Sequence, residues 1–209
     1  MKIIFARHGE SYANLRHEIA NRGLRYGLTI RGRKQAQELA SRLEKFQITR
    51  IYSSPLLRAI ETTIILSYHL NIDYEIVDCL REFDCGIAEG RTDEAAWRLW
   101  KSLFFAWIDD QDWEKRIEGG ESFYDLRNRF LPFIDDLKGH YGNGPENILC
   151  LTHGGLLGMM LPLVLVNVDT DFMRQQSYDY ASFIVSKLSP DGLICTHWNG
   201  ELTGSVEGY

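Results

Sequence analysis

The most constraining feature of this sequence is the alternation, along most of its length, of short apolar segments with longer amphipathic ones. The short segments have the length and composition of buried strands and cover residues 3–6, 50–53, 74–77, 147–152, 181–188 and 193–197. The longer segments repeat apolar residues at helical spacing and cover residues 30–46, 55–70, 97–107, 123–137 and 154–164. Strands and helices that alternate through short loops favour an α/β fold. We predict a three-layer α/β/α sandwich with helices on both faces of a mostly parallel sheet.

Several residues predict where helices begin or bend. Ser54 and Pro55 have the residue types of an N-cap and a first helical position. Ser122 followed by Asp125 has the spacing of a capping box. Pro132 lies inside the helix that Ser122 opens, so we expect a kink or a lost backbone hydrogen bond there.

The length and composition of the chain fit one globular domain. We assign all 209 residues to a single domain, because no repeat or linker divides them. The net charge of −6 argues against nucleic acid as the main partner, although a local cationic pocket for a small anion remains compatible with it. No apolar run approaches the roughly 20 residues of a membrane span, and the N-terminus lacks the features of a signal peptide. Four cysteines without a C-x-x-C pair favour reduced thiols over a zinc site, so we expect a cytoplasmic protein.

Chemically capable side chains follow four of the predicted strands. Arg7 and His8 follow the first strand, Arg58 the second and Glu82 the third. His153 follows the strand at 147–152. Because ligands of open α/β sheets bind at the carboxyl ends of the strands, we expect these five side chains to meet at one edge. Taken singly, each has an ordinary structural explanation; the joint occurrence favours a site.

The residues around these positions resemble the sequence motifs of the histidine phosphatase superfamily, the phosphoglycerate mutase-like proteins. Five blocks occur in the family's order: Arg7-His8-Gly9-Glu10-Ser11 with Asn14, Ser53 to Ala59 with Glu61-Thr62, Leu80-Arg81-Glu82 with Gly86 and Glu89-Gly90, Gly119-Gly120-Glu121-Ser122, and Thr152-His153-Gly154-Gly155. The resemblance extends from residue 2 to about residue 158. One departure is Ala13, where many members have Trp.

The resemblance implies a phosphoglycerate mutase-like fold and a phosphatase that forms a phosphohistidine on His8. A neutral imidazole can attack phosphorus, and arginine is suited to neutralise phosphoryl oxygens. The resemblance implies the following set of site residues: His8 as nucleophile, Glu82 as proton donor and acceptor, and Arg7, Asn14, Arg58, His153 and Gly154 in the phosphate pocket. The resembled mechanism uses no metal and no cofactor, and its substrate would be a small phosphorylated metabolite.

The segment at about 91–120 carries Trp97, Trp100, Phe104 and Trp107 at helical spacing. These aromatic residues would pack a helix onto the sheet, and the resemblance also implies a helical lid over the pocket; the two are compatible. Basic residues in this segment are matched by acidic ones, so the lid is not clearly suited to a second phosphate.

Other activities remain open. A cofactor-dependent phosphoglycerate mutase-type phosphotransferase is disfavoured, because Gly155 and the run at 90–93 depart from the mutase motifs, and the mutases' longer insertion before the fourth block is missing. A catalytically inactive phospholigand-binding protein is disfavoured because all five strand-end residues are present. The sequence leaves the natural substrate open. It also leaves open a homodimer, to which the tail at 199–209 could contribute.

Overall fold

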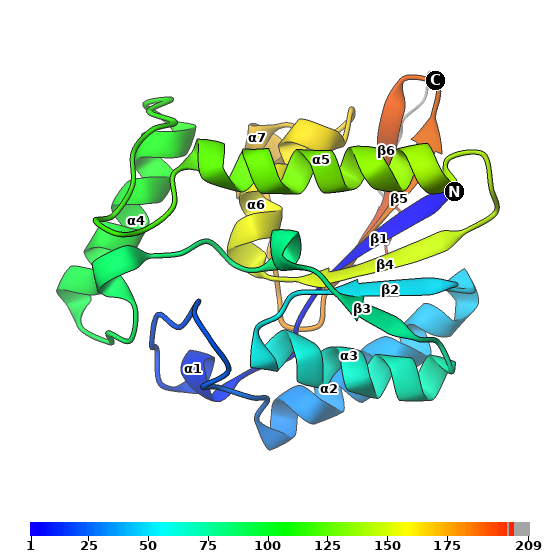
Figure 1. Ribbon diagram of the computed structural model, residues 1–209, viewed down its shortest axis with the longest axis horizontal. Coiled ribbons are helices and arrows are strands. Elements are labelled where there is room, and N and C mark those ends of the chain that lie inside the picture. The colour runs from blue at the N-terminus through cyan, green and yellow to red at the C-terminus, as the bar shows by residue number, and fades with distance from the viewer. Residues whose placement is uncertain (200, 203–209) are drawn as a thin grey trace.

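The computed structural model describes residues 1–199, 201 and 202, and within them the chain forms one mixed sheet flanked by helices (Figure 1). The seven strands in this part of the chain stand in the order β3-β2-β4-β1-β5-β6-β7. Their bounds are β1 Lys2–Arg7, β2 Arg50–Ser53, β3 Tyr74–Ile76, β4 Asn147–Thr152, β5 Phe183–Ser189, β6 Gly192–Trp198 and β7 Glu201–Leu202. The expectation for the tail at 199–209 concerns mainly residues 200 and 203–209, which lie outside the described residues.

The strands that carry the site candidates are parallel. β1 pairs with β4 with Arg7 opposite Thr152, β4 pairs with β2, and β2 pairs with β3, all in the parallel sense. The later strands β5, β6 and β7 join through antiparallel pairs, so β6 runs with the first four strands while β5 and β7 run against them. The carboxyl ends of β1, β2 and β4 therefore lie along one edge, as the sequence predicted.

The helices cover both faces of the sheet, which confirms the predicted sandwich (Figure 1). Their bounds are α1 Tyr12–Leu15, α2 Ile30–Leu43, α3 Leu57–Leu70, α4 Glu94–Ile108, α5 Phe123–Tyr141, α6 Gly154–Val164 and α7 Thr170–Gln175. Alternate residues of β1 belong to different cores: Ile3 and Phe5 pack in the cluster with α5 and α6, whereas Ile4 and Ala6 pack with α2 and α3. A strand buried on both faces has to be apolar throughout, which is why residues 3–6 read as a continuous apolar run.

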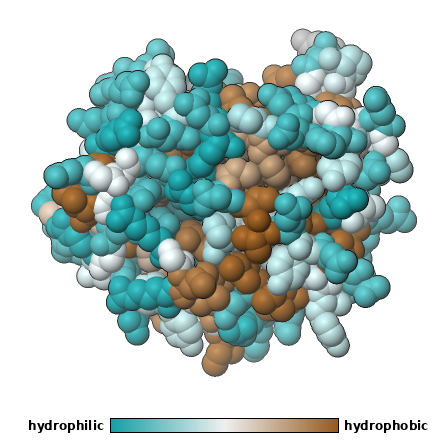
Figure 2. Space-filling view, viewed as in Figure 1, coloured by the Kyte–Doolittle hydropathy of each residue, from teal (hydrophilic) through white to brown (hydrophobic). Residues whose placement is uncertain are grey.

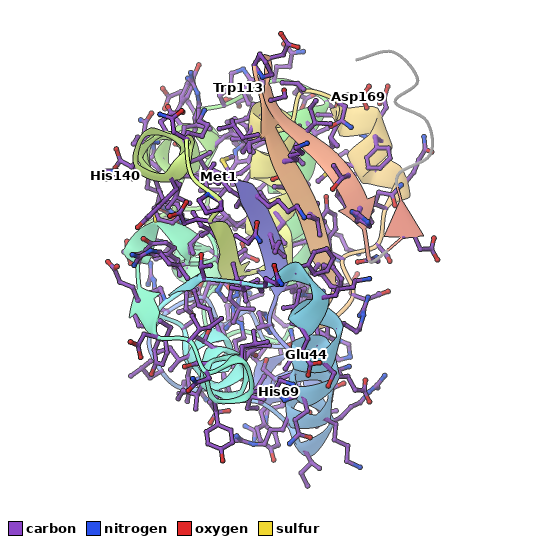
Figure 3. All side chains as sticks on the ribbon, turned by 90° about the vertical axis from the view of Figure 1, so that its right-hand side faces the viewer. Met1, Glu44, His69, Trp113, His140 and Asp169 are labelled. Carbon is purple, nitrogen blue, oxygen red and sulfur yellow. The ribbon has the colours of Figure 1, made fainter. Side chains whose placement is uncertain are left out.

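Most predicted helices begin where the sequence indicated. Thr29 caps α2 by accepting a hydrogen bond from the amide of Gly32, and Ser122 with Asp125 forms the predicted capping box of α5. Pro132 lies inside α5, and a second proline, Pro162, lies inside α6. Seen from the side in Figure 3, His69 at the end of α3 and Glu44 just after α2 lie together, with 2.5 Å between Nε2 and Oε1.

The predicted start of α3 was wrong. The helix begins at Leu57 with Leu56 as its N-cap, and no side chain caps it. Ser54 is not the cap because its hydroxyl lies 2.6 Å from Nε2 of His153 and also accepts a hydrogen bond from the amide of Leu56. The hydroxyl of Ser54 therefore contacts His153 at the edge of the sheet and does not cap α3. Arg58 still lies in the first turn of α3.

The segment between β3 and α5 leaves the sheet and crosses its carboxyl edge. Two single 3₁₀ turns, Asp78–Leu80 and Gly86–Ala88, interrupt this otherwise irregular segment, and α4 follows. Figure 1 shows α4 and α1 at the same end of the molecule, where β1 and β4 end. Trp107 is fully buried, whereas Trp97 and Trp100 are half-buried, so one end of the aromatic stripe packs in the core and the other lies near the strand edge.

Figure 2 shows apolar side chains gathered on the surface over α3 and β3, where Ile64 and Ile76 are exposed. Within the described part of the chain, no helix is both long enough and apolar enough to cross a membrane.

Candidate active site

His8 directly follows β1, and only 2% of its surface is exposed. Its Nδ1 lies 2.7 Å from the carbonyl oxygen of Gly9, which can only accept a hydrogen bond. Its Nε2 lies 3.1 Å from Nε of Arg58, which can only donate. These two partners fix the neutral tautomer with the proton on Nδ1 and with the electron pair of Nε2 accepting the hydrogen bond from Arg58. Burial, followed by the charges of Arg58 and Arg7, lowers the pKa of His8 well below its ordinary value and favours the same neutral form.

Arg58 connects His8 to the loop after α1. Its Nη1 donates a hydrogen bond to the carbonyl of Ala20 at 2.5 Å, and its Nη2 donates to the side-chain oxygen of Asn21 at 3.2 Å. Burial lowers the pKa of Arg58 to about 10, so the guanidinium stays charged at neutral pH. Three fixed directions of hydrogen bonding leave the guanidinium plane little freedom beside the His8 ring.

Arg7, the residue before His8, brings a second guanidinium group to the pocket. Its Nη1 donates a hydrogen bond to the carbonyl of Tyr178, and its guanidinium carbon lies 4.3 Å from the ring centroid of Tyr180. Burial lowers its pKa. Its Nε is buried and has no hydrogen-bond partner among the described residues. A Cβ at Gly154 would lie 3.3 Å from this Nε, so the glycine leaves the space in front of the donor open.

His153 precedes α6 and lies against His8, with 5.0 Å between the ring centroids. Its Nε2 is 2.6 Å from the hydroxyl oxygen of Ser54, and its Nδ1 is buried without a partner among the described residues. Burial and the charge of Arg58 lower the pKa of His153, which favours a neutral ring. Since nearly all buried polar atoms in proteins are hydrogen-bonded, Nδ1 of His153 and Nε of Arg7 mark a place where a polar ligand would be stabilised.

Glu82 follows β3 and one of the short turns, and only 8% of its surface is exposed. Its two oxygens accept hydrogen bonds from the amide of Gly155 at 2.8 Å and from its neighbour Phe83 at 3.1 Å. Burial raises the pKa of Glu82, although the amide of Gly155 and the charge of Arg58 oppose the rise. A carboxyl group with a raised pKa can hold and release a proton near neutral pH.

These side chains surround one pocket of about 120 Å³ at the strand edge. Six of the seven predicted site residues line it: Arg7, His8, Asn14, Arg58, Glu82 and Gly154. His153 is not among the lining residues, and its ring packs against that of His8. The side chain of Asn14 accepts hydrogen bonds from the amide and hydroxyl of Ser11, so it also holds the first turn of α1.

Sequence reasoning missed several residues that hold the site together. Asn21 positions Arg58 and also donates a hydrogen bond to the carbonyl of Phe83 at 2.9 Å. Its own amide donates to Glu89, which also accepts from the amide of Cys85. Asn21 lies in an irregular loop, so no periodicity or motif distinguishes it from other loop residues. Tyr178 and Tyr180, which hold Arg7, lie about 170 residues away from it in the chain.

The described residues contain no group of three or more histidine, cysteine, aspartate or glutamate side chains arranged to hold a metal ion. Positive charge in the pocket comes from Arg7 and Arg58. Two guanidinium groups and the unpartnered Nδ1 of His153 beside the neutral imidazole of His8 are suited to a tetrahedral oxyanion such as a phosphoryl group.

Comparisons with known proteins agree with this chemistry. The model of the histidine phosphatase superfamily (branch 1) matches residues 3–201. A probable phosphoglycerate mutase of Proteus mirabilis is 34% identical over 173 residues, which cover 79% of this chain and 75% of that protein. The 6-phosphofructo-2-kinase/fructose-2,6-bisphosphatase of Gallus gallus is 32% identical over 78% of this chain, and the match spans only 32% of that longer protein.

A solved structure with the same fold is that of a mycobacterial glucosyl-3-phosphoglycerate phosphatase in complex with VO3. It superimposes with a TM-score of 0.75 and 24% identity, covering 95% of this chain and 98% of that one. At this identity the likeness establishes the phosphoglycerate mutase-like fold.

Proposed function

Because the chain belongs to the histidine phosphatase superfamily (branch 1), we propose that it hydrolyses a phosphomonoester through a phosphohistidine on His8. The observation that carries this proposal is the tautomer of His8. Its Nδ1 proton is held by the carbonyl of Gly9, which leaves the Nε2 electron pair beside Arg58 in the pocket. A buried histidine kept neutral by burial and by the charges of two arginines is a nucleophile ready to attack an anionic phosphoryl group.

In the first step Nε2 of His8 attacks phosphorus, the N–P bond forms and the bond from phosphorus to the ester oxygen breaks. Once Nε2 of His8 bonds phosphorus, the Nε–H of Arg58 donates to a phosphoryl oxygen instead of to the imidazole, and Arg7 offers its unpartnered Nε–H to another phosphoryl oxygen. Glu82, whose pKa is raised by burial, gives a proton to the departing alkoxide. The products of this step are the free alcohol, a phosphohistidine and a Glu82 carboxylate.

In the second step the Glu82 carboxylate takes a proton from water, and the water oxygen attacks phosphorus. The N–P bond breaks, inorganic phosphate leaves, and His8 and Glu82 regain their starting protonation states. We assign to His153 a hydrogen bond from Nδ1–H to a phosphoryl oxygen. The Ser54 hydroxyl, which lies 2.6 Å from Nε2, would donate to that nitrogen and keep the proton on Nδ1.

We favour hydrolysis over the mutase-type transfer that a relative's name suggests. A mutase has to hold a second anionic group of its substrate, and among the described residues the pocket lining contains no arginine or lysine besides Arg7 and Arg58. The two reactions differ in product: hydrolysis releases one inorganic phosphate per ester consumed, whereas a mutase returns an isomeric ester.

The remaining sequence-based expectations complete the proposal. We propose that the reaction needs no metal ion and no cofactor, because the two arginines neutralise the phosphoryl oxygens. We further propose that residues 91–120 act as a lid, since Trp97 and Trp100 line the pocket. A cytoplasmic location, a single domain and a homodimer stay predictions.

The proposed function is tested by comparing how much the hydrolysis rate falls in Glu82→Gln for two esters with different leaving groups. The variant should lose about 100-fold or more of the rate with benzyl phosphate, whose alkoxide needs a proton. It should lose far less with para-nitrophenyl phosphate, whose leaving group is stable as an anion. Inorganic phosphate release measures both rates, and His8→Asn should abolish both. Equal losses on both esters in Glu82→Gln would remove Glu82 from the acid role, and full activity in His8→Asn would overturn the proposed function.

A further inference from the structure

The pocket has a second region beyond the phosphoryl-binding groups. Its remaining walls come from the loop at 13–21 and from α4, and they include Ile19, Glu18, Trp97 and Trp100. Because the leaving group of a bound ester has to point away from His8 and the arginines, this region receives the alcohol part of the substrate.

Two tryptophans give this region an aromatic wall that is fixed before any ligand binds. Trp97 donates a hydrogen bond from Nε1 to the carbonyl of His17 at 2.8 Å, which joins α4 to the opposite wall. Trp100 packs edge-on against Trp97, with ring centroids 5.6 Å apart, and lies against Phe104 at 4.2 Å. Trp100 also stacks on Phe83, the residue after Glu82, at an interplanar angle of 23°. The aromatic wall therefore begins beside the proposed proton donor.

The charged side chain that this region adds to the described lining is an acidic one, Glu18, which forms an ion pair with Arg25 outside the lining. Glu18 is the only charged residue of the lining apart from Arg7, Arg58 and Glu82, within the part of the chain that the structure describes. Its oxygens accept hydrogen bonds from Nη1 of Arg25 at 3.0 Å and from the hydroxyl of Tyr26 at 2.5 Å. Arg25 is held by this carboxylate and by the Tyr26 ring 4.8 Å away, so it is committed to the wall and is not a free cation for a ligand.

We propose that this enzyme is specific for phosphomonoesters whose alcohol is planar and apolar and carries no second anionic group. The inference rests on the proposed phosphatase function and adds to it the class of leaving group. A carboxylate or second phosphate on the alcohol would meet Glu18 and two indole rings, and in the described lining no arginine or lysine besides Arg7 and Arg58 could stabilise it. A planar ring would stack on the tryptophans, and a donor group on that ring could use the spare acceptor positions of Glu18.

This specificity differs from what the names of three relatives imply. Phosphoglycerate, fructose 2,6-bisphosphate and glucosyl-3-phosphoglycerate each carry a second anionic group besides the phosphate that is removed. The difference lies in the outer walls of the pocket, since His8, Arg7 and Arg58 would hold the phosphoryl group in any of these esters.

Three alkyl phosphates with the same type of leaving oxygen test the inference with the full chain: propyl, benzyl and 4-carboxybenzyl phosphate. We expect kcat/KM for the benzyl ester to exceed that for the propyl ester by about 2- to 12-fold, as aromatic pairing predicts. The carboxylate should reduce kcat/KM by at least about tenfold relative to benzyl phosphate, because it is repelled by Glu18. Equal rates on the propyl and benzyl esters, or a preference for the carboxylated ester, would overturn the inference without any variant.

Substitutions in the pocket wall test which residues cause the preference for benzyl phosphate over propyl phosphate and over the carboxylated ester. Trp97→Leu should bring the ratio of kcat/KM for benzyl phosphate to kcat/KM for propyl phosphate close to one. Phe105→Leu is the control and should leave this ratio unchanged, since Phe105 lies on the same helix with 64% of its surface exposed. Glu18→Gln should reduce the difference in kcat/KM between benzyl phosphate and 4-carboxybenzyl phosphate. An unchanged ratio in folded Trp97→Leu, or an unchanged difference in Glu18→Gln, would contradict these assignments. Absence of hydrolysis of every ester, para-nitrophenyl phosphate included, would instead refute the proposed function.

Discussion

Gly155, the second residue of α6, fixes the position of the Glu82 carboxyl group. Its amide donates a hydrogen bond to Oε2 of Glu82 at 2.8 Å. A Cβ at this position would lie 2.6 Å from Cε1 of Phe83 and 2.8 Å from both oxygens of Glu82. Ordinary contact begins near 3.4 Å. The change Gly155→Ala therefore has to displace the carboxyl group by about 0.6 Å and the Phe83 ring by about 0.8 Å in a closely packed interior.

We expect Gly155→Ala to reduce both stability and catalysis. Inserting a methyl group into a packed site costs about 1–3 kcal/mol, which lowers the melting temperature by about 2–4 °C per kcal/mol in a chain of this size. A misplacement approaching 1 Å costs about 100-fold in rate, and the loss should be larger for benzyl phosphate than for para-nitrophenyl phosphate because the proton donor is the group displaced.

Thermal unfolding and inorganic phosphate release measure the two effects, and Gly158→Ala is the matched control. Gly158 lies one turn further along α6, and its added Cβ would meet only Cε2 of Tyr178 at 4.0 Å. A helix-interior glycine replaced by alanine without a clash should gain about 0.5–1 kcal/mol. If Gly155→Ala behaved like Gly158→Ala in both assays, the close approach of Gly155 to Glu82 would not matter and the reasoning would fail.

Three further predictions concern the charges of the site. Arg58→Ala should lower kcat by about 10- to 100-fold, the value of a charge-assisted hydrogen bond of about 1.5–3 kcal/mol; a variant with unchanged kcat and only a raised KM in steady-state assays would contradict a transition-state role. Because the pKa of buried His8 is lowered, the unfolded chain binds a proton below about pH 6.5 that the folded chain does not. The free energy of unfolding should therefore decrease as the pH is lowered below about 6.5, by up to about 1.4 kcal/mol per pH unit from this group. Urea unfolding between about pH 5 and 7 should show a shallower dependence in His8→Gln, and an identical slope would count against the burial argument. Activity should persist in EDTA and be inhibited by vanadate; loss in EDTA that magnesium restores would contradict a metal-free reaction.

Much of the architecture was predictable because buried strands and amphipathic helices carry their pattern in consecutive residues. The strand at 147–152 and the capping box of α5 at Ser122 are where the sequence placed them. The short helices α1 and α7 were not predicted, since four and six residues are too few to show a helical period. The N-cap of α3 was wrong because the hydroxyl of Ser54 is engaged by His153, a contact that exists only in the folded chain.

The site was predictable to the extent that strand ends determine it. His8, Arg58 and Glu82 follow adjacent or nearby parallel strands, so the topology alone brings them together. The residues that orient them were not predictable in this way. Asn21 reaches Arg58 from a loop, and Tyr178 reaches Arg7 from the far end of the chain. Such contacts depend on how loops cross the sheet edge, and residue type and spacing do not specify that path.

The central claim is that His8 becomes covalently phosphorylated during turnover, and rapid chemical quench with a radiolabelled phosphomonoester tests it directly. The wild-type chain should accumulate label that is acid-labile and base-stable and that maps to His8, and His8→Asn should accumulate none. The label should decay as inorganic phosphate appears, since water attacks the phosphohistidine. Label on a serine, or no labelled protein while the enzyme is turning over, would contradict the account.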